Sequence, residues 1–170
     1  IVVSWFRDHF DFVPERQWLV KTPGVVYALA MAVRALTKEG EAVIIQPPVY
    51  YPFYNVIRNN NRQIIESPLV YADGKYTIDF EDFENKIKAN DVKLFILCSP
   101  HNPVCRVWTK AELQKLGEIC KKYGVYVVAD EIHCDFTWEG HPHTVITQAC
   151  PDMTDRVIIR ISGHRLLPWA

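Results

Sequence analysis

The sequence predicts an α/β fold, a mainly parallel sheet with helices on both faces. Three short apolar runs, at 43–45, 94–98 and 125–129, are typical of strands buried on both faces, and the last of them is enriched in β-branched residues. Segments with helical spacing of apolar residues alternate with these runs, which favours right-handed βαβ connections. A chain of 170 residues is long enough for one domain with its own core.

Composition and charge exclude several classes of protein. Hydrophobic residues make up 49% of the chain and charged residues 23%, as in an ordinary soluble globular domain. The net charge of −1 argues against a nucleic-acid partner or an anionic membrane. The longest apolar runs are strand-sized and no signal-peptide pattern precedes them, so we expect no membrane span and a cytoplasmic location. Five cysteines without a Cys-x-x-Cys pair indicate neither a disulfide framework nor a standard zinc module.

The N-terminal part predicts a helix, a strand and a second helix. Residues 1–10 have the apolar spacing of a helix packed on one face, and residues 18–20 predict a short strand. Thr22 can cap, and Pro23 can begin, a helix that reaches about Leu36. A helix start of this kind can receive a phosphate on its free amides, which are those of Gly24, Val25 and Val26. A plain capped helix that binds nothing is the alternative.

Four aromatic rings follow the next strand. Residues 41–46 predict a strand that Pro47-Pro48 ends, and the rings lie within residues 50–54. A flat cofactor could stack on one of them, with Tyr50 as the candidate, although a satellite core under a loop explains the rings equally well. A short helix to about residue 60, a strand at 62–67 and a turn at 73–74 complete this part.

The third part ends at a polar loop. A helix at 77–88 and a strand at 93–98 lead to Ser99-Pro100-His101-Asn102-Pro103. The prolines fix Asn102 at a strand's carboxyl end, where its amide can donate to an anionic oxygen. Thr109 then caps a helix at 110–123 that Gly124 ends.

The stretch from Val125 to His133 organises the chain, because its apolar run stops abruptly at two carboxylates. Asp130 should lie at the mouth of the crevice, where α/β sheets bind ligands, and can hold a buried cationic group. The alternative is an acidic pair that caps the next segment. Residues 156–159 predict a last strand. All the candidate positions follow strand ends, and this convergence favours a common site.

Four ordered motifs together resemble the large domain of fold-type I, pyridoxal-phosphate-dependent class I/II aminotransferases, and most closely the MalY/PatB-type C–S β-lyases. They are Thr-Pro-Gly-Val-Val, Pro-Pro-Val-Tyr-Tyr-Pro-Phe, Ser-Pro-His-Asn-Pro-Val and Ala-Asp-Glu-Ile-His. The resemblance covers residues 1–159, which we expect to form an incomplete large domain, followed by a divergent tail at 160–170.

The resemblance implies a set of residues that bind pyridoxal 5′-phosphate. Gly24, Val25 and Val26 would hold the phosphate with their amides, and Tyr50 would stack on the pyridine ring. Asn102 would hydrogen-bond the phenolic oxygen, near His133, and Asp130 would pair with the protonated ring nitrogen. The implied reaction is β-elimination from a sulfur amino acid, giving pyruvate, ammonia and a thiol. Transamination is the alternative, and a homodimer is the implied assembly.

Two departures from the family pattern affect these expectations. Cys105 stands where the family usually has glycine, in a turn that is disturbed if positive φ is needed. The family's Schiff-base lysine, expected shortly after Ile159, is absent: no lysine follows Lys122, and Arg165 falls near the place. We therefore expect an inactive chain, or a non-catalytic product that binds cofactor loosely or associates with a partner.

A metal site is a third hypothesis, from another class of function. Its ligands would come from a segment rich in suitable side chains: His133, Cys134, Asp135, His141 and His143. The spacing matches no standard zinc signature, so we expect no metal.

Overall fold

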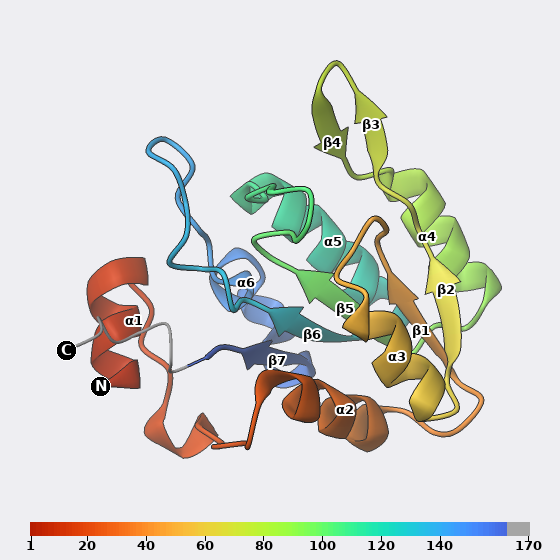
Figure 1. Cartoon of the computed structure of the whole chain (residues 1–170), viewed down its shortest axis with the longest axis horizontal. Coiled ribbons are helices and arrows are strands. Elements are labelled where there is room, and N and C mark those ends of the chain that lie inside the picture. Colours follow the sequence, from red (N-terminus) through yellow and green to blue (C-terminus); the bar gives the residue numbers. More distant parts are fainter. Residues whose placement is uncertain (163–170) are drawn as a thin grey trace.

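The computed structural model describes residues 1–162 of the chain. Its centre is a five-stranded parallel sheet with the strand order β2-β1-β5-β6-β7 (Figure 1). The strands are β1 (Ala42–Ile45), β2 (Gln63–Glu66), β5 (Leu94–Cys98), β6 (Tyr126–Asp130) and β7 (Val157–Arg160). β1, β5 and β6 are almost entirely buried, which confirms the interpretation of the apolar runs as central strands.

Helices cover both faces of the sheet, as predicted. One face packs on α2 (Val25–Leu36) and α3 (Pro52–Asn59). The other packs on α4 (Phe80–Ala89), α5 (Lys110–Tyr123) and α6 (Ile146–Ala149). The two hydrophobic cores lie on opposite sides of the sheet because successive side chains of a strand point to opposite faces.

Local sequence signals set the ends of α5. The Thr109 side chain accepts a hydrogen bond from the Glu112 amide, and the Glu112 carboxylate accepts one from the Thr109 amide, which forms a capping box. Gly124 ends the helix at φ 69°, where glycine has no steric penalty. α5 therefore ends where the sequence predicts, and β6 begins at Tyr126, one residue later than predicted.

The prediction of a strand at residues 18–20 is wrong. The segment contains instead a short 3₁₀ helix, η1 (Arg16–Trp18), and Leu19 and Val20 are exposed. No strand of the described chain pairs with it, and apolar β-branched residues alone do not make a strand without a partner. α2 also begins later than predicted, because Gly24 is its N-cap and the Thr22 hydroxyl donates to the Gly24 carbonyl oxygen instead of capping.

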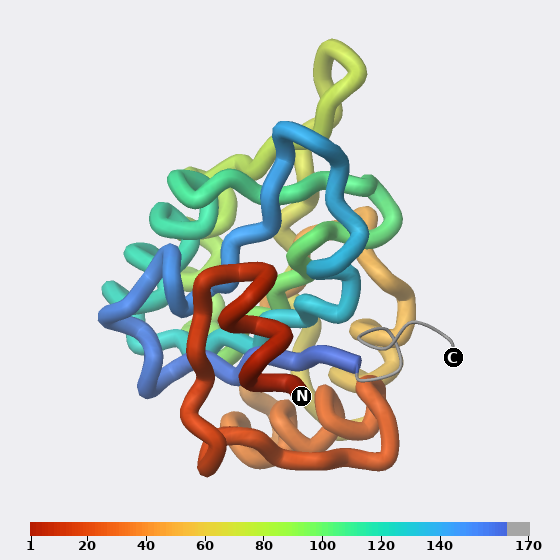
Figure 2. The backbone as a smooth tube through the Cα atoms, turned by 90° about the vertical axis from the view of Figure 1, so that its left-hand side faces the viewer, coloured from red at the N-terminus to blue at the C-terminus, as the bar shows by residue number. Residues whose placement is uncertain are grey.

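The predicted turn at Asp73-Gly74 lies within a hairpin that the sequence analysis missed. Its strands are β3 (Val70–Ala72) and β4 (Lys75–Thr77), which pair antiparallel. Asp73 and Gly74 both have positive φ, as a two-residue hairpin turn requires. The hairpin extends away from the rest of the molecule (Figure 1 and Figure 2).

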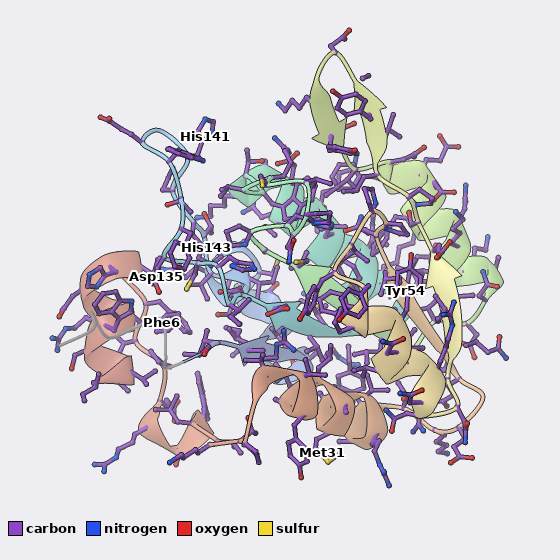
Figure 3. All side chains as sticks on the ribbon, in the orientation of Figure 1. Phe6, Met31, Tyr54, Asp135, His141 and His143 are labelled. Atoms are coloured by element: carbon purple, nitrogen blue, oxygen red, sulfur yellow. The ribbon has the colours of Figure 1, made fainter. Side chains whose placement is uncertain are left out.

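The N-terminal helix α1 (Val2–Phe10) packs on the long loop that follows β6. Phe6 forms a small third core with Cys134 and Val145. The Trp5 indole N–H also donates to Asp135 Oδ1 at 2.9 Å. Figure 3 shows Phe6 beside this loop, on which Asp135 and His143 lie close in and His141 lies further out. Among residues 1–162, no helix combines the length and apolar character required to cross a bilayer.

Candidate functional site

Asp130 lies at the carboxyl end of β6, between β5 and β7, and is 2% exposed. Its carboxylate is bound on both oxygens by Arg160, the last residue of β7. Arg160 Nε donates to Oδ1 at 3.1 Å and Nη2 donates to Oδ2. Asp130 was predicted to hold a buried cation at this edge, and the cation in the structure is a residue of the same chain.

The same guanidinium reaches the start of α2. Arg160 Nη1 donates to the Val25 carbonyl oxygen at 2.6 Å. The candidate phosphate-binding residues Gly24, Val25 and Val26 therefore lie beside the Asp130–Arg160 pair. The first amides of a helix have no acceptor within the helix, and a Cβ built on Gly24 would meet no atom within 4 Å. The helix start is therefore open to an anion on this side.

Asn102 lies on the loop after β5, which is the strand next to β6. Its backbone amide donates to Cys98 Sγ at 3.3 Å, and Cys98 pairs in register with Asp130. Burial, with a smaller contribution from the Asp130 carboxylate, raises the pKa of Cys98 to about 12. The thiol therefore stays protonated at neutral pH and holds the Asn102 loop in place.

His101 connects this loop to the segment before Tyr50. Its ring is buried, and Nε2 lies 3.1 Å from the Pro48 carbonyl oxygen, so Nε2 carries the hydrogen. Burial lowers the pKa of His101 to about 4, which leaves the ring neutral at neutral pH. The His101 ring also contacts Trp108 edge-on, and the Trp108 indole donates to the Cys98 carbonyl oxygen at 2.9 Å.

Tyr50 follows β1 at the same edge of the sheet. Its ring is half-buried and meets the fully buried ring of Phe53 edge-on, with centroids 5.9 Å apart. The alternative of an aromatic satellite core therefore holds for Phe53, which packs with α2 and the sheet. Tyr50 lies at the border of that cluster and keeps part of its ring accessible.

The turn after Asn102 requires the conformation that the glycine of the family pattern would allow. Cys105 is exposed and has φ 56°, the left-handed region in which a Cβ costs roughly 1–2 kcal/mol. Its amide donates to the His101 carbonyl oxygen at 2.8 Å. The substitution therefore strains the turn without removing it.

The side chains proposed as metal ligands lie on the segment after Asp130, where they have different partners. Glu131 is fully buried and accepts hydrogen bonds from His143 Nε2 at 2.9 Å and from the Ile146 amide at 3.0 Å. Cys134 packs in the core under α1, and the half-buried His133 lies with its ring 6.5 Å from that of Phe136. Over residues 1–162 no group of three histidine, cysteine or carboxylate side chains is placed to hold a metal ion.

Two residues of this edge were missed by the sequence analysis: Arg160 and Cys98. Cys98 gave no signal beyond its place at the end of an apolar strand. Arg160 could have been found from the sequence, because a charged residue that ends a buried strand needs a partner of opposite charge. The neighbouring strand ends in Asp130. Arg165 lies outside the described residues.

The chain matches the model of the family described as aminotransferase class I and II over residues 4–161. It is 46% identical to the cystathionine beta-lyase PatB of Bacillus subtilis over 154 residues, which are 91% of this chain and 40% of PatB. It is 32% identical to the protein MalY of Escherichia coli over 142 residues, 84% of this chain and 36% of MalY.

The fold is also that of a solved structure in the same group. The chain superposes on cystalysin from Treponema denticola, a structure that contains a pyridoxal 5′-phosphate cofactor, with a TM-score of 0.93 and 42% identity. The match covers 96% of this chain and 42% of cystalysin, so the chain spans less than half the length of these relatives. With its parallel sheet and its helices on both faces, the chain belongs to the aminotransferase class I and II family.

Proposed function

We propose that residues 1–159 are the cofactor-binding large-domain part of a pyridoxal-phosphate-dependent C–S β-lyase. The substrate would be a small sulfur amino acid such as cystathionine, and the products pyruvate, ammonia and a thiol. The observation that carries the proposal is the position of Asp130, a buried carboxylate at the carboxyl end of β6 beside the start of α2. The 46% identity to a cystathionine beta-lyase supports the choice of reaction.

The other candidate positions fit the cofactor. The amides of Gly24, Val25 and Val26 suit its phosphate, the accessible face of Tyr50 suits its ring, and Asn102 and His133 suit its phenolic oxygen. When bound, pyridoxal phosphate supplies an electron sink for the substrate's α-carbon, and a carboxylate beside the ring nitrogen is what keeps that nitrogen protonated.

Asp130 does not fit this role in the chain as it stands. Both of its oxygens accept hydrogen bonds from Arg160, so its negative charge is already paired with a buried cation where the ring nitrogen would have to lie. The chain also has no lysine after Lys122, and a guanidinium such as that of Arg165 stays protonated and cannot form the imine that a lysine forms. We therefore propose that this sequence retains the binding architecture of a lyase without its catalytic competence.

Transamination is the second candidate, because the matching family model is named for aminotransferases, whereas the relative PatB is named as a lyase. Loose cofactor binding or association with a partner, without catalysis, is the third. We also propose a homodimer. Apolar side chains are exposed around the start of α2, where a second subunit could cover them: Trp18, Leu19, Val20, Tyr27 and Met31. In Figure 3, Met31 lies on the side of α2 that faces away from the sheet.

A chimaera tests the proposed reaction. Residues 1–159 of this chain would be joined to the part of PatB that follows the position equivalent to Ile159, which supplies the lysine together with the remainder of PatB. We expect pyruvate release from cystathionine, with PatB itself as the control for the assay. Asp130→Asn in the same chimaera should abolish most of this release. A folded chimaera that binds pyridoxal phosphate but only transaminates would favour the second candidate, and one that binds none would overturn the proposal.

A further inference from the structure

We propose that Arg160 is an internal substitute for the cofactor's ring nitrogen and holds the Asp130 site closed to pyridoxal phosphate in this chain. The inference rests on the proposed function, because it concerns the same site. It adds a residue that the family motifs do not contain and a reason why the retained site should bind cofactor poorly.

The hydrogen bonds of Asp130 support the substitution directly. A protonated pyridine offers this carboxylate one positive charge and one N–H donor. Arg160 offers one positive charge and two N–H donors, one to each carboxylate oxygen. The two side chains are 3% and 4% exposed, so water does not compete for either. The guanidinium also stays charged at every physiological pH.

The position of Arg160 is fixed by the backbone. β7 pairs with β6 in a parallel register that places Arg160 opposite Asp130, and the Glu131 amide donates to the Arg160 carbonyl oxygen at 2.9 Å. The side chain therefore starts at the carboxyl end of β7, the strand next to β6. A change in its own torsions is enough to take the guanidinium away from the carboxylate.

The third contact holds the guanidinium in place from a second direction. Arg160 Nη1 binds the Val25 carbonyl oxygen at 2.6 Å, so one guanidinium links Asp130 to the start of α2. This contact uses a carbonyl oxygen, whereas a phosphate would be held by the amides of the helix start, so the block concerns the ring-nitrogen end of the site. A cofactor that entered would have to displace a buried cation from three acceptors, and the displaced cation would need new partners. The observed affinity for the cofactor is then reduced in proportion to the fraction of molecules in which the Asp130–Arg160 pair is broken.

The test is direct binding to the whole chain, with two probes that cannot react with lysines. The first is 4′-deoxypyridoxine 5′-phosphate, which has the ring nitrogen and the phosphate but no aldehyde. The second is phenyl phosphate, which lacks the ring nitrogen. Calorimetric titration of Arg160→Gln should give at least about tenfold tighter binding of the first probe than the unaltered chain gives. Binding of phenyl phosphate should change by less than about twofold.

Two further variants make the result specific. Asp130→Asn in the Arg160→Gln background should remove the gain, because the gain depends on the freed carboxylate. Arg156→Gln is the matched control, since Arg156 lies just before β7 and donates to the Gly124 carbonyl oxygen at the other end of the sheet, and it should leave both affinities unchanged. If circular dichroism shows that Arg160→Gln does not fold, Arg160→Lys, which keeps the charge but loses the paired donors, should give a smaller gain for the first probe alone.

An equal gain for both probes would overturn the proposal, because Arg160 would then block the site by bulk and not by substituting for the ring nitrogen. No gain in any folded variant would overturn it as well. The chimaera does not contain Arg160, so its pyruvate release reports on the proposed lyase function separately.

Discussion

Asp130 and Arg160 lie opposite each other on neighbouring parallel strands and form a two-point ion pair that is almost completely buried. A charge in the interior is tolerated only when its partner is in place, because desolvation of either ion alone costs several kcal/mol. The pair therefore joins β6 to β7, and through the Val25 carbonyl oxygen it also joins both strands to the start of α2.

Removal of one partner should be much more costly than removal of both. Asp130→Asn leaves the guanidinium buried without its counter-charge, and we expect a loss of about 3–5 kcal/mol in the free energy of unfolding. Asp130→Asn combined with Arg160→Met replaces the pair by neutral groups and should cost less than either single change. Urea denaturation of the four proteins of this cycle measures the coupling. Additive losses would mean that the two charges do not stabilise each other.

The strained turn at Cys105 should be relieved by the residue that the family pattern contains. Cys105→Gly removes the Cβ from a backbone at φ 56°, and we expect a net stabilisation of about 1 kcal/mol after the added flexibility of the unfolded chain is included. Cys105→Ala is the matched control, because it removes the thiol but keeps the Cβ, and it should change little. A glycine variant no more stable than the alanine variant would contradict the strain.

The sequence predicted the order of the main elements because each has a strong local signal. The buried strands are apolar runs, and α5 has Thr109 at its start and Gly124 at its end. The errors occurred where the outcome depends on distant residues. Leu19 and Val20 have strand propensity but no neighbouring strand, and the β3–β4 hairpin depends on pairing across a turn of which only the centre was recognised.

The edge of the sheet at which the candidate residues lie could also be predicted from the sequence. Three strand ends place Tyr50, Asn102 and Asp130 along one edge, and this follows from the rule that parallel strands share their carboxyl edge. No strand precedes Gly24 within residues 1–23, and the start of α2 lies at this edge through the contact of Arg160 with Val25. The partner of Asp130 did not follow from any motif. It depends on the register between β6 and β7, which alone decides that residue 160, and not residue 159 or 161, lies opposite the carboxylate.

His101 should make stability fall in mild acid. Its pKa is lowered from 6.5 to about 4 in the folded state, so the unfolded chain binds the proton first as the pH decreases. The contribution of neutral His101 is complete above about pH 6.5 and is lost between there and about pH 4, by up to roughly 3 kcal/mol. Urea denaturation at pH 7.5 and pH 5 should give a smaller difference for His101→Gln than for the unaltered chain.

His9 provides the control for this prediction. It is exposed on α1, and its Nδ1 lies 3.0 Å from the Trp5 carbonyl oxygen on the protein surface. His9→Gln should keep the full pH dependence of the unaltered chain. If His101→Gln and His9→Gln show the same dependence, the acid sensitivity comes from other groups.

The absence of a lysine after Lys122 should be visible as the absence of a specific covalent adduct. Incubation of the chain with pyridoxal phosphate, reduction with borohydride and peptide mapping should give only scattered labelling of surface lysines. Side chains such as Lys121 and Lys122 are exposed and lie on α5, so they react by chance and not by position. The PatB chimaera is the positive control, since it regains the lysine.

The same absence should also remove the lyase activity. In the family the same amine tethers the cofactor and carries the proton, so its loss should lower the rate by orders of magnitude, and no pyruvate should form from cystathionine. One stoichiometric adduct on a single lysine of this chain, together with pyruvate release, would mean that another residue has taken over both tasks.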